Sequence, residues 1–251
     1  MERLDKFIAD QRSLPRSEAA KAVYRGQVTV GGAVCKIPGA KIDPETAAVA
    51  VDGQVICYQK YVYLMMNKPQ GALSATSDDR AKTVLDLVPP EWRRKNLFPV
   101  GRLDIDTVGL LLLTDDGDFA HRILSPKKDI VKRYRALIDG AVTDEDVAVF
   151  KSGVVLADRT NFRPAEMKEV QNPGFSEAVS AMYHIPFSPE NVAVEIAISE
   201  GKYHQIKRMM ASVGHKILWL QRISVGGLLL DETLPEGSCR PLAPFETASI
   251  F

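Results

Sequence analysis

The residues best suited to chemistry lie in the segment VGRLDIDTVGLLLLTDDGDFAHRILSPK, residues 100–127. Two aspartates, Asp104 and Asp106, stand just before GLLLLT (109–114), an apolar run that is typical of a buried strand. A loop that leads into such a strand can hold a carboxylate beside an apolar floor. An ionised carboxylate in that setting can act as a nucleophile or as a proton acceptor.

Each aspartate also has a simpler interpretation, because an isolated aspartate most often caps a turn. Two carboxylates that flank a bond would suit a glycoside hydrolase. If the segment is extended, however, residues 104 and 106 share one face and point in parallel, so they do not straddle a substrate. We therefore interpret Asp106 as a structural residue that makes local backbone hydrogen bonds.

A partly buried aspartate that stays ionised needs a cationic neighbour, because burial alone raises the pKa of a carboxyl group. The segment SEGKYHQIKRMM (199–210) contains suitable cations. A solvated basic helix is the alternative interpretation of that segment.

The elements that must position these residues are strands and helices that interleave without a fixed period. YVYLMMNKP predicts a strand that ends at a proline, and further strand-like runs cover 109–114, 132–138, 191–199 and 217–230. Helical stretches lie near 116–124, 143–152 and 204–214. This order predicts an α+β domain around a mixed or antiparallel sheet, spanning 63–251.

A small α/β module is predicted for residues 1–57, joined to the larger domain by a linker at 58–62. Apolar residues at helical spacing predict a helix over 3–10, and a second helix begins after Pro15, with Ser17 as its N-cap, and stops at Gly26. QVTV-GG-AVC predicts a hairpin at Gly31 and Gly32. A further strand, AAVAVDGQV, completes the module.

Charge is balanced over the whole chain but uneven along it. The 32 Lys and Arg equal the 32 Asp and Glu, which gives no global sign of a nucleic-acid partner. Residues 1–41 nevertheless hold eight basic residues against four acids, 121–135 hold six against one, and 201–222 hold five against none. These segments suit phosphate contacts, and solvated helix surfaces would have the same composition.

Several classes of protein are disfavoured. The three cysteines form no C-x-x-C pair, the four histidines lack zinc-ligand spacing, and there is no Walker A or Rossmann glycine pattern, so we expect no metal and no cofactor. The N-terminal segment has no signal-peptide core, and no apolar run approaches the length of a membrane span. We therefore expect a soluble protein of the reducing cytoplasm, with no membrane partner.

The module at the N-terminal end resembles a known RNA-binding family. R-L-D-K-F-I, P-R-S-E-A and G-Q-V-T-V-G-G, within residues 2 to about 50, are similar to the S4 module, in which two helices and a hairpin turn form a basic surface that faces RNA. V-G-G stands where the family usually has V-N-G. The resemblance implies RNA contacts by residues of the two helices: Arg3, Lys6, Arg16, Ser17, Lys21 and Arg25.

The larger domain resembles the RsuA/RluA superfamily of pseudouridine synthases. GRLDIDT (101–107) followed by GLLLLT matches its catalytic motif, which implies that Asp104 is the catalytic residue in detaching a uracil from its ribose and rejoining it through carbon. EGKYHQIKRM implies that Ile206 and Lys207 line the uracil pocket and that Lys207, an arginine in many relatives, pairs with the aspartate. Tyr134 would stack on the base, and Arg102 would help to hold the flipped nucleotide. Lys68 and Pro69 of NKPQG would shape the floor, which we interpret as a structural role.

Within the superfamily, GRLDIDTVGL, TDDGDFAHRILSP and EGKYHQIKRM are most similar to the branch that modifies one uridine of 16S ribosomal RNA. This implies 16S RNA as partner, within a small-subunit assembly intermediate, and we expect a monomer. The branch that acts on the large subunit more often has R-N-R-Q in place of K-Y-H-Q. A non-catalytic factor that binds ribosomal RNA remains an alternative from another class.

Overall fold

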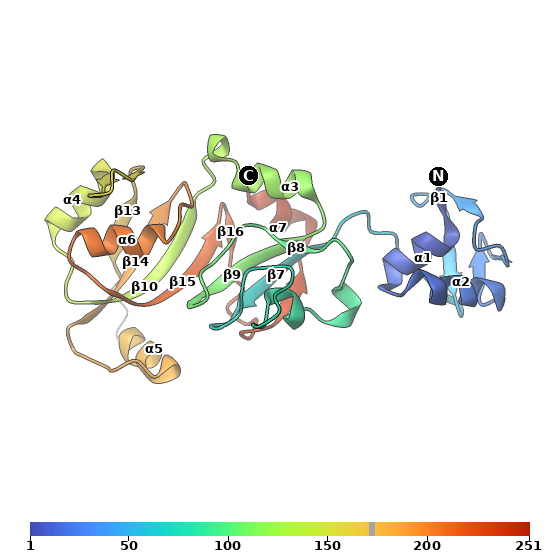
Figure 1. Ribbon diagram of the computed structural model, residues 1–251, viewed down its shortest axis with the longest axis horizontal. Coiled ribbons are helices and arrows are strands. Elements are labelled where there is room, and N and C mark those ends of the chain that lie inside the picture. The colour runs from blue at the N-terminus through green and yellow to red at the C-terminus, as the bar shows by residue number, and fades with distance from the viewer. Residues whose placement is uncertain (171–173) are drawn as a thin grey trace. The chain divides into compact units, whose positions relative to one another are not determined.

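The computed structural model describes residues 1–170 and 174–251, which form two compact units (Figure 1). One unit comprises Met1–Val62 together with Val88–Leu97, and the other comprises Tyr63–Leu87 together with Phe98–Phe251. Residues 88–97 thus pack with the N-terminal residues, where the hydroxyl of Ser13 and the carbonyl of Arg93 form a hydrogen bond. No helix in the described part of the chain is long and apolar enough to cross a membrane.

Two helices, α1 (Leu4–Arg12) and α2 (Arg16–Tyr24), form the helical part of the N-terminal unit. The predicted apolar stripe is confirmed, because Leu4, Phe7 and Ile8 are fully buried in its core. The predicted N-cap is wrong: Ser17 lies inside α2, and Pro15 is the N-cap. The carbonyl of Pro15 accepts the hydrogen bond from the Glu18 amide at 2.9 Å, so the helix begins directly after the proline.

The strands of this unit are short. The predicted hairpin is confirmed, with Gly31 and Gly32 both at positive φ between β2 and β3. The predicted single strand AAVAVDGQV is wrong, because Asp52 and Gly53 also have positive φ and fold it into a second hairpin. The strands are β1 (Glu2–Arg3), β4 (Lys41–Ile42) and the four-stranded sheet β3 (Ala33–Val34), β2 (Val28–Val30), β5 (Val49–Val51), β6 (Gln54–Val55).

The second unit is built on a mixed sheet, as predicted. Its order is β13-β14-β10-β15-β9-β7-β17, with every neighbouring pair antiparallel except β15 and β9. The strands are β7 (Tyr63–Lys68), β9 (Thr107–Thr114), β10 (Lys132–Asp139), β13 (Glu166–Glu169), β14 (Asn191–Ile198), β15 (Ile217–Val225) and β17 (Cys239–Pro241). Smaller strands are β8 (Phe98–Pro99), β16 (Leu228–Leu229), β11 (Val154–Val155) and β12 (Asn161–Phe162).

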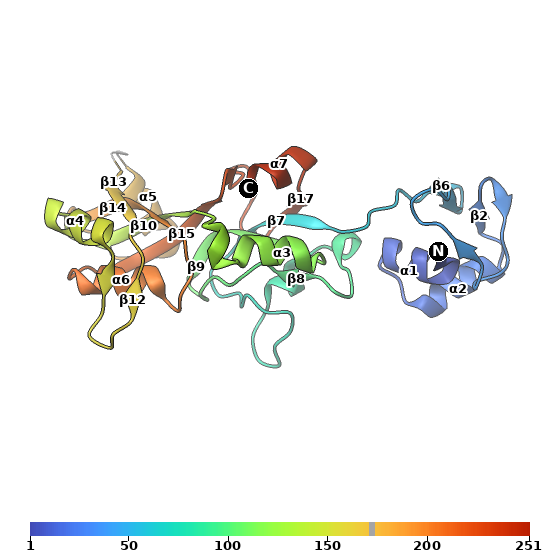
Figure 2. The same ribbon diagram turned by 90° about the horizontal axis from the view of Figure 1, so that it is seen from above.

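Helices lie on both faces of this sheet (Figure 2). The predicted helices are confirmed as α3 (Gly117–Leu124), α4 (Asp144–Ser152) and α6 (Gln205–Ser212), and α5 (Phe175–Tyr183) and α7 (Pro244–Ser249) were not predicted. Single 3-10 turns cover Val84–Leu87, Pro90–Trp92 and Pro126–Lys128. Helix α5 packs on Leu137 and Trp219. Helix α6 lies on the opposite face, which Tyr134 and Leu220 share.

The parallel contact between β9 and β15 depends on one glycine. Gly109 has a φ of +97°, and a Cβ atom there would lie 2.4 Å from the carbonyl oxygen of Arg222. Only glycine allows the two backbones to approach so closely. This contact fixes the beginning of β9, and with it the loop that carries Asp104, beside the strand that follows α6.

Candidate active site

The loop before β9 is a turn held by its backbone. The amide of Thr107 donates to the carbonyl of Asp104 at 3.1 Å, so the segment is not extended at the two aspartates and the parallel arrangement considered from the sequence does not occur. The hydroxyl of Ser74 bonds both backbone groups of Leu103 at 3.0 and 3.1 Å. These contacts fix the backbone on each side of Asp104.

Lys68 anchors the same loop from beneath. Its ammonium is completely buried and donates to the carbonyls of Ile105 at 3.3 Å and Thr107 at 2.9 Å. Burial lowers the pKa of Lys68 to about 8, and the nearby carboxylates of Asp106 and Asp104 partly oppose that shift. Lys68 therefore has the structural role expected for it, because it occupies carbonyls of the loop and leaves the carboxylates free to face other groups.

Lys207, in the first turn of α6, lies against both carboxylates. Its Nζ is 3.2 Å from Oδ2 of Asp104 and 2.5 Å from Oδ1 of Asp106. Burial lowers the pKa of Lys207, but the hydrogen bonds to Asp106 and Asp104 outweigh it, so the net shift is upward. The pairing expected between Lys207 and Asp104 is present. Asp106 also contacts Lys207. This contact was not predicted, because Asp106 was expected to make only local backbone hydrogen bonds.

A further side chain, His204, contacts the aspartate. Its Nε2 lies 3.6 Å from Oδ1 of Asp104, and its backbone is left-handed, with φ of 46°, just before α6 begins. This contact was not predicted, because the four histidines lack the spacing of zinc ligands. The available signal was position, because His204 precedes Ile206 and Lys207 within one helical turn.

These residues line one small pocket. Asp104, Tyr134, Ile206 and Lys207 all contribute to its wall, and Arg102 lies on its exposed side. Tyr134 from β10 and Ile206 from α6 are almost completely buried. The arrangement offers an aromatic ring and an aliphatic side chain to a flat ligand, with a carboxylate held beside an ammonium.

Two details define the polarity of the pocket. Thr107 is buried in its wall, and its hydroxyl oxygen has no hydrogen-bond partner among the described residues. Arg102 is exposed and forms no ion pair with any residue in the described part of the chain. An unpaired guanidinium at the mouth suits an anionic ligand.

The basic residues expected to contact RNA lie in the other unit, mostly in local ion pairs. Arg3 and Arg16 both contact Asp5, Lys6 contacts Glu2, and Lys21 contacts Glu18 at 2.7 Å. The guanidinium groups of Arg3 and Arg16 hold the pKa of Asp5 down, at about 2. Ser17 and Arg25 are exposed, and Arg25 has no ion pair among the residues described.

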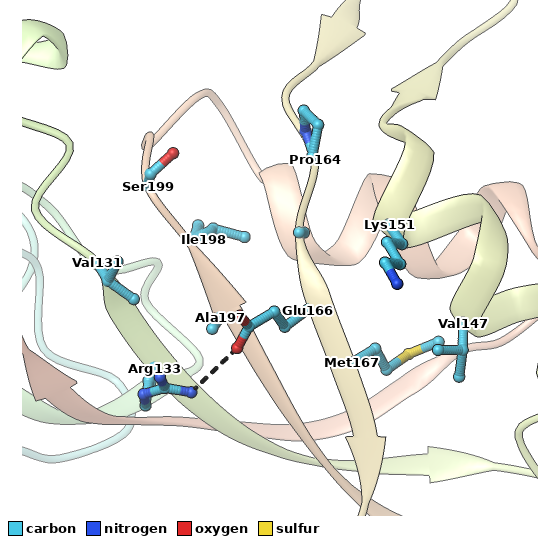
Figure 3. A pocket seen from close by; sticks show the side chains of 11 residues that line it. Val131, Arg133, Val147, Lys151, Pro164, Glu166, Met167, Ala197, Ile198 and Ser199 are labelled. Atoms are coloured by element: carbon cyan, nitrogen blue, oxygen red, sulfur yellow. Dashed lines mark hydrogen bonds and ion pairs between the residues drawn. The ribbon is translucent and has the colours of Figure 1, made fainter.

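A second pocket is larger but lacks this chemistry (Figure 3). It encloses about 550 Å³ and is lined mainly by apolar side chains such as Val131, Met167 and Ile198. Its one carboxylate, Glu166, pairs with Arg133 at 3.5 Å and is mostly exposed on the rim. The carboxylate that contacts an ammonium, that of Asp104, lies instead in the smaller pocket.

Comparison with known proteins identifies two families along the chain. Residues 62–212 match the family model described as RNA pseudouridylate synthase, and residues 2–47 match the S4 domain. The chain is 39% identical to an uncharacterised RNA pseudouridine synthase of Bacillus subtilis, over 97% of this chain and 96% of that protein. It is 38% identical to ribosomal small subunit pseudouridine synthase A of Escherichia coli, over 99% of both chains.

A solved structure gives the same result. A pseudouridylate synthase of known crystal structure is 33% identical in sequence to this chain. The two structures match over 100% of both chains, with a TM-score of 0.64. Both resemblances that were expected from the motifs are therefore confirmed at the level of the family.

The buried ammonium of Lys68 predicts a dependence of stability on pH. The pKa of Lys68 is about 8 in the folded protein and 10.5 in the unfolded chain, where the side chain is not buried. Between these pH values the unfolded chain holds a proton that the folded chain has released. The free energy of unfolding of the unsubstituted protein, relative to Lys68→Met, should therefore rise with pH between about 8 and 10.5, by up to about 1.4 kcal/mol per pH unit.

Urea unfolding at several pH values measures this difference. Following Trp219 fluorescence in a Trp92→Phe background confines the signal to the unit that contains Lys68. Two curves that stay parallel from pH 7 to 10 would show that Lys68 does not titrate in this window.

Proposed function

Because the chain belongs to the RNA pseudouridylate synthase family and carries an S4 domain, we propose that it converts one uridine of 16S ribosomal RNA to pseudouridine, with Asp104 as the catalytic residue. The observation that carries the proposal is the contact of Asp104 with Lys207, in a pocket that also contains Tyr134. The small-subunit substrate is supported by the relative in Escherichia coli, which is named for it.

The reaction requires few groups from the protein. The bond between N1 of uracil and C1′ of ribose breaks, the base turns, and a bond forms between C5 and C1′, while the proton on C5 is lost and N1 gains one. Asp104 can attack C1′ as a nucleophile or accept a proton at the sugar. In either role it must be ionised, and Lys207 stabilises its negative charge at 3.2 Å.

The pocket also suits a base that has left its stack. A uridine within an RNA stem must be everted before a protein side chain can reach C1′. Tyr134 supplies an aromatic face for the uracil, and Ile206 supplies an apolar one. Arg102, exposed and unpaired among the described residues, can bind the phosphate of the everted nucleotide.

The S4 unit would supply affinity that is independent of the reaction. Its exposed ion pairs, such as Lys21 with Glu18, contribute little to folding, so a phosphate can replace the carboxylate at small cost. We propose further that the enzyme acts as a monomer and that its substrate is 16S RNA within a small-subunit assembly intermediate.

The substitution Asp104→Asn tests the role of Asp104. Asp106→Asn is the matched control, because Asp106 contacts the same ammonium, that of Lys207. Asp104→Asn should abolish the release of tritium from 16S RNA labelled at uracil C5, because the neutral amide can neither attack nor accept the proton. RNA binding should persist. Asp106→Asn should keep activity within about tenfold, since it removes only an accessory contact of Lys207, worth about 1.4 kcal/mol or less.

Each rival function gives a different result. Undiminished tritium release by Asp104→Asn would refute the catalytic assignment, and no release by the unsubstituted protein on any ribosomal RNA would favour a non-catalytic binding factor. Release from 23S RNA alone would identify the large-subunit branch. Free uracil in place of pseudouridine would identify a hydrolase.

The S4 surface is tested by the double variant Lys21→Ala/Arg25→Ala. It should bind 16S RNA more weakly, and the slope of log K against log salt concentration should become shallower by about 2, because about one phosphate contact is lost per cation. Lys60→Ala/Lys95→Ala removes two exposed lysines of the same unit that lie outside the basic segment 1–41, and it is the control. Equal slopes for the two double variants, measured by filter binding, would show that Lys21 and Arg25 do not contact the RNA.

A further inference from the structure

An exposed tyrosine stands at the edge of the catalytic pocket. Tyr203 is 76% exposed, although a single exposed aromatic residue is by itself unremarkable on a protein surface. Its ring, however, is stacked on the imidazole of His204, with ring centroids 3.9 Å apart and planes inclined by 16°. One face of the tyrosine ring therefore packs on His204, and most of the side chain is open to solvent.

The stack lies next to Asp104, the proposed catalytic residue. His204 lines the pocket and lies 3.6 Å from Asp104, while its ring face carries Tyr203. The backbone of His204 adopts the left-handed conformation, which is uncommon for a residue other than glycine. This conformation joins the loop to α6, with His204 in the pocket wall and Tyr203 next to it in the chain.

We propose that Tyr203, backed by His204, is a stacking platform for an unpaired base of the RNA that neighbours the everted uridine. The inference rests on the proposed function. Eversion removes the target base from between its two neighbours, so each neighbouring base loses a stacking partner. The open face of Tyr203 replaces that partner, since any base can stack on an aromatic ring.

The charge at the pocket mouth fits the same ligand. Arg102 lines this pocket and has no ion pair among the described residues, so it is available for the phosphate between the everted nucleotide and its neighbour. Lys202, which precedes Tyr203, is occupied by contacts with Glu200 and the carbonyl of Asn161. The ring of Tyr203 and the guanidinium of Arg102 can thus bind the base and the phosphate of the nucleotide that precedes or follows the target.

Steady-state formation of pseudouridine on 16S RNA tests the platform. Tyr203→Ala should raise KM about tenfold, with kcat changed by less than about threefold, because a stacked base outside the pocket contributes to binding. Tyr203→Phe keeps the aromatic face and should restore KM to within about twofold. Phe245→Ala removes an equally exposed aromatic residue, on α7, and should leave KM unchanged.

Binding measured without turnover separates this inference from the proposed function. In an Asp104→Asn background, adding Tyr203→Ala should weaken filter binding to 16S RNA about tenfold, and adding Tyr203→Phe should not. A KM and an affinity that Tyr203→Ala leaves unchanged would overturn the platform while the synthase assignment stands. If the unsubstituted protein made no pseudouridine, the proposed function would fail and the platform would fail with it.

Discussion

The ammonium of Lys207 is the group on which the candidate site depends. It lies against two carboxylates, Asp104 and Asp106, that would repel each other without a cation between them. A lysine ammonium is a compact charge with three donors, and it can serve both carboxylates at once. The arrangement places one anionic carboxylate beside Tyr134 and keeps the second as a partner of the lysine.

The scaffold brings these distant residues together by a small number of backbone contacts. Asp106 and Lys207 are 101 residues apart in the chain. The close approach of β9 to β15 at Gly109 fixes the aspartate loop beside the strand that follows α6, and the buried ammonium of Lys68 secures the loop from below. Lys68 thus binds the backbone carbonyls of the loop, and Lys207 binds its two carboxylates.

Sequence patterns predicted most of the fold because local chemistry determined it. The apolar stripe of α1 is a periodic signal and GLLLLT is a continuous apolar run, and both are buried as expected. Local signals also explain the errors: Asp52-Gly53 is a hairpin turn that was overlooked within an apparent strand, and Pro15 displaced Ser17 as the helix cap. The contact of Lys207 with both aspartates was only half predicted, because Asp106 was interpreted from its local turn chemistry. His204 was missed because its position depends on the tertiary fold and on a left-handed backbone that no spacing rule indicates.

The most direct test of the account compares Lys207→Arg with Lys207→Gln in single-turnover formation of pseudouridine at saturating enzyme. Arginine keeps a positive charge beside Asp104, and we expect its rate to stay within about tenfold of the unsubstituted protein. Glutamine keeps the hydrogen-bonding capacity but not the charge, and its rate should fall by about a hundredfold or more, equivalent to about 2.7 kcal/mol. A glutamine variant as fast as the arginine variant, with equal RNA binding, would contradict the claim that this cation sustains catalysis.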